Sequence, residues 1–465
     1  MGATIARIVI AGTHSGVGKT TIATGLMAAL SKRGHKVASA KVGPDFIDPG
    51  YHEVATGRPG RNLDSWISGA EAVPALASNA AAGADILVVE GVMGLFDGPS
   101  STAEVARIIA APVVLVVDGS SMSTSVAAIV HGYHTFSSEV SLSGVILNRV
   151  GSPTHEDALR AALSPLGIPV LGAIARDPSL TWRDRHLGLI PVVEQRQDVA
   201  KSVRLLADAV ERSCDLEQIE LLARSATLMP PGSLPETRRV ARATVAVAAG
   251  AAFAFIYPEN LERLEEAGAE LAPFDPLTEK RLPEQATGLY VAGGFPEVFA
   301  EALAENRALC DDVRTRIAMG MVTWAECGGM LWLARTLNGR RMCSAVPADA
   351  RMTSTLTLGY RTVSTLGPSP IARVGAQLRG HEFHYSTLEP CGDGLMVQRS
   401  PGSGTRTVAR QAGYTSRSLI ASYVHLHLGA DPSAAEHFVA ATAARAGRIG
   451  SAHISSAGEP STGLA

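Results

Sequence analysis

The chain has 465 residues, of which 46% are hydrophobic and 18% charged, and its 41 basic and 44 acidic residues give a formal net charge of -3. This length exceeds one ordinary core, so we expect two or three domains, and the high apolar share argues against global disorder. The near balance of charge, without a long basic run, argues against nucleic acid as a partner.

The cysteines are scattered, odd in number and without CxxC spacing: Cys214, Cys310, Cys327, Cys343 and Cys391. This argues against a disulfide framework and a zinc site, and it favours a reducing compartment such as the cytoplasm. The apolar run at residues 5–10 leads straight into Gly12, which is typical of a buried strand and not of a signal peptide. No uncharged apolar stretch reaches about 18 residues, so we expect no membrane span.

The first half of the chain alternates short apolar runs with segments of helical spacing. We expect strands at residues 5–10, 36–40, 86–89, 113–117, 145–147 and 170–174. Residues 21–33 are typical of a helix, because Ile22, Leu26 and Leu30 recur at helical spacing and Gly34 supplies a stop. The alternation predicts an α/β fold with a parallel sheet and right-handed crossovers.

Adjacent prolines and a polar run near residues 228–237 indicate a linker, after which a second α/β pattern begins. Strands are expected at 244–249, 288–292, 322–325, 356–363 and 378–385, and helices at 256–267 and 329–337. The end of the chain is rich in Ser, Gly and Pro, which is typical of disorder. We therefore expect a first domain at 1–228, a linker at 229–240, a second domain at 241–446 and a disordered tail at 447–465.

Residues 12–21, GTHSGVGKTT, have the features of a phosphate-binding loop between a strand and a helix. Glycines let backbone N–H groups turn toward phosphate oxygens, and the helix directs its positive end to the same place. Lys19 adds a full charge, and the Thr20 hydroxyl can bind magnesium. The common pattern would place the first glycine where Thr13 stands. The loop alone predicts a nucleoside triphosphate, and its expected ligands are Gly12, Gly16, Gly18, Lys19, Thr20 and Thr21.

Charged residues follow the next two expected strands. Lys41, Asp45 and Asp48 lie in KVGPDFIDPG, and Glu90 and Asp97 lie in EGVMGLFDG. In an open parallel sheet the loops after adjacent strands converge on one crevice, so we expect these side chains around the γ-phosphate. Carboxylate oxygens suit a hard Mg²⁺ ion. A solvated surface position remains the alternative for any single acid.

Cys327 stands in TWAECGGMLWL, between an expected strand and an expected helix. A tight turn with glycines would expose the thiol as a nucleophile, and the helix N-terminus would favour the thiolate. Gly293 and Gly294 follow another strand and are candidates for the N–H groups of an oxyanion hole. His425 and His427 are candidates for the base. The alternative for Cys327 is a buried structural cysteine.

Long motifs in this order resemble the cobyrinic acid and hydrogenobyrinic acid a,c-diamide synthases, which are corrinoid glutamine amidotransferases of cobalamin biosynthesis. The resemblance covers nearly the whole chain and rests on residues 12–21, 41–50, 61–64, 90–98, 148–150, 185–189, 256–261, 293–297, 325–331, 380–385 and 422–427. It implies a dethiobiotin-synthetase-like P-loop domain followed by a class I glutamine amidotransferase-like domain. It also implies ATP, Mg²⁺, glutamine and a corrinoid as cofactor and substrates, and it allows a homodimer.

The resemblance further implies that ATP phosphorylates the a and c side-chain carboxylates of the ring in turn, and that ammonia from glutamine then displaces the phosphate. The implied roles are phosphate binding for Lys19 and Lys41, magnesium binding for Thr20, Asp48 and Glu90, contact with the substrate carboxylate for Asp45 and Asp97, adenine contact for Asn148, nucleophile for Cys327 and base for His425.

Two positions depart from the family pattern. The acid that usually follows the catalytic histidine by two residues is replaced by His427, so the group that orients His425 is not predicted. The strand at 244–249 is commonly followed by an acid, whereas this chain reads AGAAF at 249–253, which would weaken glutamine use if that acid binds glutamine or aligns the domains. For His381 and His384 a structural role and a substrate contact are both open.

Other functions remain open from the sequence. A sirohydrochlorin a,c-diamide synthase or a cobyric acid synthase would use the same chemistry on another substrate, although residues 41–50 and 90–98 favour the a,c-diamide branch. A P-loop regulatory ATPase with an inactive glutaminase-like domain is a further alternative, and His14 stands near the place where such ATPases often carry a second lysine. The form of the phosphate loop slightly favours the cobalt-containing ring over the metal-free one.

Overall fold

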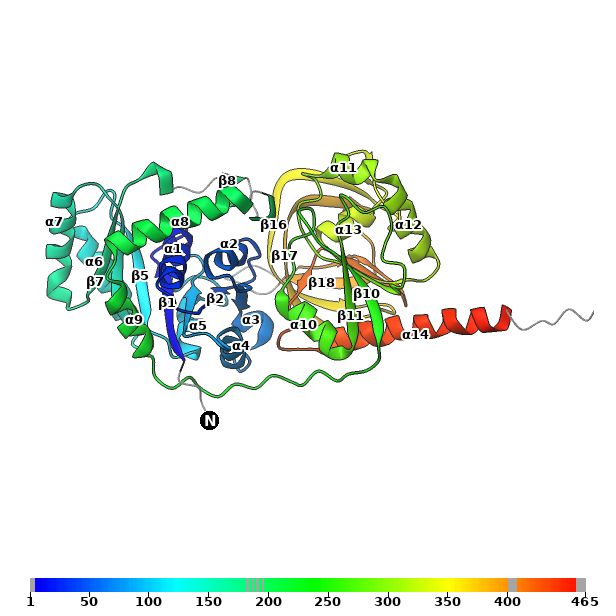
Figure 1. Cartoon of the computed structure of the whole chain (residues 1–465), viewed down its shortest axis with the longest axis horizontal. Helices are drawn as coiled ribbons and strands as arrows, with labels where there is room; N and C mark the ends of the chain where they lie inside the picture. Colours follow the sequence, from blue (N-terminus) through cyan, green and yellow to red (C-terminus); the bar gives the residue numbers. More distant parts are fainter. Residues whose placement is uncertain are drawn as a thin grey trace, which may run out of the picture. The chain divides into compact units, whose positions relative to one another are not determined.

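The computed structural model describes residues 5–180, 184–185, 188–189, 192–194, 196–399 and 408–456. The chain divides between Leu234 and Pro235 into two compact units, inside the stretch expected to be a linker (Figure 1). The motif at 185–189 lies only partly within the described residues. The sequence predicts a disordered tail from residue 447, but helix α14 continues to Ser456, and residues 457–465 lie outside the described part.

The first unit is built on a seven-stranded parallel sheet with the order β3-β2-β4-β1-β5-β6-β7 (Figure 1). This confirms the predicted α/β fold of the first half. Strand β1 lies between β4 and β5, and the strand order reverses direction at this point of the sheet. In open parallel sheets, ligands bind beyond the carboxyl ends of the strands at such a switch point. The strands are β1 Ala6–Gly12, β2 Val37–Val42, β3 Arg61–Leu63, β4 Ile86–Glu90, β5 Val113–Asp118, β6 Leu142–Val150 and β7 Val170–Ala175, with a separate hairpin of β8 Asp184–Arg185 and β9 Gly188–Leu189.

Helices cover both faces of this sheet. The helix after the phosphate loop, α1, lies against β1, β2 and β4, and α8 packs along it. A Cβ at Gly25 would lie 2.8 Å from Val210 Cγ2, so only glycine allows this close approach of α1 and α8. The helices are α1 Lys19–Lys32, α2 Ile47–Thr56, α3 Ser65–Ser68, α4 Val73–Ala80, α5 Thr102–Ile108, α6 Ser125–Phe136, α7 Pro153–Leu163, α8 Arg196–Ser213 and α9 Leu216–Arg224, with short 3-10 turns Ser164–Leu166, Pro178–Leu180 and Val192–Glu194.

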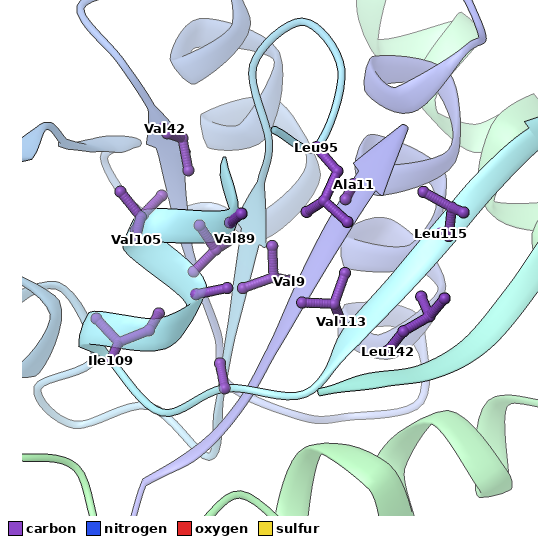
Figure 2. Packing of buried hydrophobic residues seen from close by; sticks show 14 of the residues in the cluster. Val9, Ala11, Val42, Val89, Leu95, Val105, Ile109, Val113, Leu115 and Leu142 are labelled. Atoms are coloured by element: carbon purple, nitrogen blue, oxygen red, sulfur yellow. The ribbon is translucent and has the colours of Figure 1, made fainter. Parts of the chain in front are cut away.

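The opposite face of the sheet carries the main hydrophobic core of the unit. Figure 2 shows Val9 and Ala11 of β1 with Val105 of α5 and Ile109 beyond the end of this helix. Successive side chains of a strand point to opposite faces, so the neighbouring residue Ile10 points toward the α1 face instead. Each fully buried Val, Leu or Ile stabilises the fold by about 1.5–3 kcal/mol, and the core thereby holds the sheet rigid beneath the loops at its edge.

The second unit contains two sheets. The first has the order β11-β10-β12-β13-β21-β20 and is parallel except for the β20–β21 pair, as the second predicted α/β pattern requires. Its helices pack on two sides, with α10 and α14 in one buried cluster and α13 in another. The elements are β10 Ala243–Ala248, α10 Pro258–Ala267, β11 Ala269–Phe274, β12 Gly288–Val291, α11 Ala300–Glu305, α12 Arg307–Ala318, β13 Val322–Glu326, α13 Gly328–Leu333, β20 Tyr414–Thr415, β21 Leu419–Ser422 and α14 Ser433–Ser456.

The second sheet of this unit is mostly antiparallel and follows the order β15-β14-β16-β17-β22, with β18 and β19 attached to β16. The strands expected at 356–363 and 378–385 are the middle parts of much longer strands. The helix expected at 329–337 ends at Leu333 because the chain then enters β14. The strands are β14 Thr336–Leu337, β15 Arg340–Arg341, β16 Asp349–Thr365, β17 Gln377–Glu389, β18 Leu395–Arg399, β19 Ala409–Ala412 and β22 His425–Leu426.

Over the described ranges, we find no helix with the length and apolar character needed to cross a bilayer.

A fully buried arginine ties the end of the first unit to its sheet. Arg7 of β1 donates from Nε to the Ile109 carbonyl at 2.6 Å, and its terminal nitrogens donate to the carbonyls of Ile5, Ala110 and Thr227. Burial lowers the pKa of Arg7, and the carbonyl partners compensate the buried charge in place of a carboxylate. The Arg7 side chain therefore connects β1 to the carbonyls of residues 109, 110 and 227, which are far from it in the sequence.

We expect Arg7→Met to lower the free energy of unfolding by about 3 kcal/mol, because several buried carbonyls lose their donor. Denaturant unfolding with urea measures this change. Lys32→Met is the matched control, since Lys32 forms ion pairs with Asp208 and Glu211 at the surface and its loss should change stability little. Equal destabilisation by the two substitutions would contradict the role of Arg7.

Candidate active sites

The phosphate loop lies between β1 and α1 in the conformation that an anion site requires. Gly16 and Gly18 have positive φ angles of 82° and 99°, and Gly18 precedes α1 with no side chain capping the helix and no acid in its first turn. The free N–H groups and the positive helix end therefore face the loop. Lys19 Nζ donates to the His14 carbonyl at 3.0 Å, and burial together with Lys41 lowers the pKa of Lys19 to about 8.

Strand register brings the charged groups of neighbouring strands together. Glu90, at the end of β4, lies opposite Ile10 of β1 on one side and Lys41 of β2 on the other. The fully buried Glu90 side chain therefore stands between the phosphate loop and the loop after β2. The convergence expected for loops after adjacent parallel strands is present at this point.

The side chains of Thr20, Lys41, Asp48 and Glu90 form one buried cluster. Thr20 Oγ1 donates to Glu90 Oε1 at 2.6 Å and lies 3.4 Å from Asp48 Oδ2. Lys41 Nζ lies 2.7 Å from both Asp48 Oδ2 and Glu90 Oε1 and donates to the Gly91 carbonyl. Lys41 thus neutralises the acids in this structure, and its expected contact with phosphate stays a prediction.

The charges of this cluster are not fully balanced. Burial would raise the pKa of Glu90, but Lys41 and His52 outweigh burial and hold this pKa below its ordinary value. Burial, followed by Asp45 and Glu90, raises the pKa of Asp48 well above its ordinary value despite the contact with Lys41. A divalent cation would lower the cost of holding these acids ionised.

The oxygens of Thr20, Asp48 and Glu90 fit Mg²⁺, which takes one or two carboxylates and completes its shell with phosphate and water oxygens. In the part of the chain that the structure describes, no group of three or more His, Cys, Asp or Glu residues is arranged to hold a metal by itself. Any magnesium bound by these residues would therefore depend on the nucleotide for the rest of its ligands.

Asp45 and Asp97, the acids expected near the substrate carboxylate, both stand in loops that bend around this cluster. Asp45 Oδ1 accepts the Ile47 N–H at 2.8 Å at the start of α2, and Asp97 Oδ2 accepts the Gly94 N–H at 3.0 Å. In the described part of the chain, each carboxylate therefore accepts a backbone N–H from its own loop.

Asn148, the residue expected to contact adenine, braces the phosphate loop itself. Its Nδ2 donates to the Val17 carbonyl at 2.9 Å, and a Cβ at Gly18 would lie only 2.3 Å from the same nitrogen. The next residue, Arg149, donates to the Gly16 carbonyl at 2.9 Å. Both side chains therefore hold the loop in shape, and the adenine role of Asn148 stays a prediction.

Two polar residues of this site were missed from the sequence. His52 Nε2 lies 2.6 Å from Glu90 Oε2, and Asn62 Nδ2 donates to the carbonyls of Gly43 and Asp45 at 2.8 Å each. His52 follows Asp48 by four residues on α2, so helical spacing already placed both on one face. Asn62 lies in the 61–64 motif quoted for the resemblance, but its partners lie in the loop after β2, so the sequence did not predict these hydrogen bonds.

In the second unit, Cys327 occupies a strained turn between β13 and α13. Its backbone angles are φ 44° and ψ −106°, and its side chain is buried. A Cβ at Gly329 would lie 2.2 Å from the Val291 carbonyl oxygen, so the turn is pressed against the end of β12. A tight turn of this kind between a strand and a helix is the geometry expected of a nucleophile. The strained backbone of Cys327 persists because the surrounding structure enforces it, and such strain is common at functional sites.

Burial of Cys327 acts against the thiolate that the helix N-terminus is expected to favour. Burial, followed by the carboxylate of Glu297, raises the pKa of Cys327 far above its ordinary value, and this outweighs the Gly328 N–H. Helix α13 has only six residues, which limits its dipole. The thiol is therefore protonated at neutral pH and needs a base to become a nucleophile.

His425 lies beside this elbow on β22. A Cβ at Gly293 would lie 2.3 Å from His425 Cε1, so the imidazole rests directly on that glycine. Glu326 Oε2 is 3.7 Å from His425 Nδ1, and the His381 ring stacks on the His425 ring with centroids 5.0 Å apart. The sequence offered no acid for His425, and the structure provides one from the residue that precedes Cys327.

The candidate oxyanion glycines have different positions. The Gly293 carbonyl accepts the Phe255 N–H at 3.0 Å, and its Cα supports His425. The Gly294 nitrogen would lie 3.0 Å from a Cβ at Gly328, next to the nucleophile. The N–H groups of Gly294 and Gly328 are therefore the better candidates for stabilising an oxyanion, and Gly328 was not foreseen.

The two histidines left open in the sequence have separate roles in the fold. His381 pairs with His425 across β17 and β22, so it lies at the candidate base. The His384 ring stacks on Tyr423 with centroids 3.7 Å apart, and its Nδ1 lies 3.0 Å from the Ser386 carbonyl. His384 thus packs in the interior, while His381 borders the site.

The family pattern places an acid after β10, and in this chain the carboxylate of Asp275 lies near that position. Gly250 stands in this segment with φ 89°, and a Cβ there would lie 2.8 Å from the carboxyl carbon of Asp275. Asp275 follows the adjacent strand β11. A carboxylate is therefore present at this point although the AGAAF segment lacks one.

Comparisons with known proteins match both units. Residues 8–190 match the CobQ/CobB/MinD/ParA nucleotide binding domain, and residues 244–433 match the CobB/CobQ-like glutamine amidotransferase domain. The chain is 45% identical to the hydrogenobyrinate a,c-diamide synthase of Streptomyces coelicolor and 43% identical to that of Mycobacterium tuberculosis, with 94% of this chain and 98% of each relative covered. It is 40% identical to the cobyrinate a,c-diamide synthase of Priestia megaterium, with 93% of this chain and 96% of that relative covered.

We expect Gly293→Ala to lower the rate of glutamine hydrolysis by about a hundredfold or more, because the added methyl group would displace the His425 ring from the thiol. A coupled assay for glutamate measures the rate. Gly447→Ala is a control, since no atom lies within 4 Å of a Cβ at that position. Full activity of Gly293→Ala would show that the ring does not depend on this contact.

Proposed function

We propose, because the chain belongs to the hydrogenobyrinate and cobyrinate a,c-diamide synthase family, that it uses ATP and glutamine to convert the a and c carboxylates of a corrinoid into amides. The observation that carries the proposal is the presence, in one chain, of a phosphate loop surrounded by acids and of a strained cysteine whose preceding residue, Glu326, faces a histidine. We further expect the enzyme to work in the cytoplasm, where ATP and glutamine are both supplied, and a homodimer stays a prediction.

The chemistry needs both units because a carboxylate is a poor electrophile at neutral pH. In the proposed reaction, a carboxylate oxygen of the ring attacks the γ-phosphorus of ATP, ADP leaves, and an acyl phosphate forms. Ammonia then attacks the acyl carbon, the carbon–oxygen bond to phosphate breaks, and one proton passes from nitrogen to the departing phosphate. Phosphoryl transfer of this kind depends chiefly on positioning and charge stabilisation.

The residues of the first unit suit these tasks. The N-terminus of α1 and Lys19 hold the phosphates, and the lowered pKa of Lys19 means that an anion would stabilise its charged form. When Mg²⁺ is bound by Thr20, Asp48 and Glu90, it supplies charge neutralisation for the phosphates. Lys41 keeps the two acids paired, with its Nζ 2.7 Å from each carboxylate.

Asp45 and Asp97 would border the carboxylate that is activated. Both stand in loops that flank the phosphate site, and each carboxylate accepts a backbone N–H that fixes its orientation. Either acid could relay the proton from the attacking nitrogen to the departing phosphate, provided that it lies within hydrogen-bond reach of the nitrogen. Asn148 would keep the loop in register beneath the nucleotide.

The second unit would release the ammonia. Cys327 Sγ attacks the carboxamide carbon of glutamine, and His425 takes the thiol proton and returns it to the departing ammonia. The N–H groups of Gly294 and Gly328 would stabilise the oxyanion, and water would hydrolyse the thioester to glutamate. Because burial raises the pKa of Cys327, the reaction depends on His425 as the base.

The relatives favour the metal-free ring. Those named hydrogenobyrinate a,c-diamide synthase share 42–45% identity with this chain, and those named cobyrinate a,c-diamide synthase share 39–40%. The loop motif alone had slightly favoured the cobalt-containing ring. Since the relatives are compared over nearly the whole chain, we give their evidence more weight and propose hydrogenobyrinate as the preferred substrate.

We expect Cys327→Ser to abolish amidation with glutamine and to leave amidation with added ammonium salts intact, because only the release of ammonia needs the thiol. Product formation with each nitrogen source, measured by chromatography of the corrinoid, tests this. Loss of activity with both sources would contradict the proposed division of work between the units.

We expect Lys19→Ala to lower product formation by at least about a hundredfold with either nitrogen source, because the phosphates lose a full charge at the loop. Glutamine hydrolysis by the same variant serves as the folding control for the second unit. Amidation with ammonia at the unchanged rate would refute the role of the loop in activating the carboxylate.

A further inference from the structure

Two buried acids face two histidines near β22. His425 Nδ1 lies 3.7 Å from Glu326 Oε2, and His427 Nε2 lies 3.6 Å from Glu259 Oε2. Both carboxylates are almost completely shielded from water, with Glu326 2% exposed and Glu259 8% exposed. His427 occupies the sequence position where a class I glutaminase carries the acid that orients its catalytic histidine, so that acid has to come from elsewhere in the fold.

Glu326 is held firmly relative to the base. Its Oε1 accepts the N–H of Leu426, the residue next to His425, at 3.2 Å, and its Oε2 accepts the Tyr290 hydroxyl at 3.4 Å. Glu326 is also the residue before Cys327 and the last of β13. One carboxylate therefore links the strand of the nucleophile to the strand of the base, and buried networks of this kind fix geometry when their members are satisfied.

Among the described residues, His381 and Asn260 have other roles near His425. Burial, followed by His425, lowers the pKa of His381 well below its ordinary value, so the stacked ring stays neutral and offers no negative charge. Asn260 donates to the Leu426 carbonyl and accepts the Leu428 N–H, both at 2.8 Å, so the backbone on either side of His427 is anchored without Glu259.

We propose that Glu326 is the positioning residue for His425 and takes the place of the acid that is absent at position 427. Its carboxylate faces Nδ1, so the tautomer with hydrogen on Nδ1 is favoured and Nε2 is left to accept the Cys327 proton. It also stabilises the imidazolium that forms when the thiol is deprotonated, as the buried acid of a catalytic triad does. A distance of 3.7 Å is that of an ion pair and longer than a hydrogen bond, so the interaction strengthens when His425 becomes charged. The proposal rests on the glutamine half of the proposed function alone.

The test uses Glu326→Gln with Glu259→Gln as its matched control, because each substitution removes one buried negative charge beside one histidine. We expect Glu326→Gln to lower kcat for glutamine hydrolysis by about a hundredfold or more, with KM for glutamine changed little. Glu259→Gln should stay within about twofold of the unchanged protein. Glu326→Asp should recover part of the lost kcat, since it restores the charge at a longer distance.

The pH profile separates positioning from a merely structural role. His425 faces Glu326 and the ring of His381, and loss of the Glu326 charge should move the acidic limb of kcat/KM to lower pH because the imidazolium loses its partner. Equal losses of kcat in Glu326→Gln and Glu259→Gln, or an unchanged kcat in Glu326→Gln, would overturn the proposal. Glutamine hydrolysis is measured without a corrinoid, so a failure of the proposed ring chemistry would be a separate outcome.

Discussion

The burial of the Glu90 carboxylate determines how the first site is arranged. A wholly buried carboxylate costs several kcal/mol unless it is paired and hydrogen-bonded. Glu90 obtains its partners from three different elements: Lys41 from β2, His52 from α2 and the Thr20 hydroxyl from α1. The phosphate loop and the acids that follow β2 are therefore drawn to one point by the need to compensate a single charge, and the same oxygens then suit magnesium.

The second unit meets a related constraint with a thiol in place of a carboxylate. Cys327 is buried in a strained turn, and burial and nearby acids raise its pKa, so the fold stabilises the resting thiol and not the reactive thiolate. The His425 ring contacts Gly293 and has Glu326 beside Nδ1, so it is placed for the base role that we propose.

Features that depend on residues close together in the chain could be predicted from the sequence. The phosphate loop, the cysteine elbow and the strands of the parallel sheet all follow from glycine spacing and apolar runs within short segments. The long strands β16 and β17 were only partly predicted, because their side chains are mixed in burial and a register shift between Met352 and Thr357 interrupts the alternation. The partners of His425 and Gly250, namely Glu326 and Asp275, come from other strands, so no sequence pattern could have linked them, whereas the spacing of Asp48 and His52 could have.

The most direct measurement is mass spectrometry of the products formed from hydrogenobyrinate with ATP, Mg²⁺ and glutamine that carries a labelled amide nitrogen. We expect a final product in which two hydroxyl groups of the ring carboxylates are replaced by two labelled amino groups, with faster turnover than for cobyrinate. A ring that is recovered unchanged, or amidated without label from glutamine, would contradict the conclusion that this chain couples the two sites on a corrinoid.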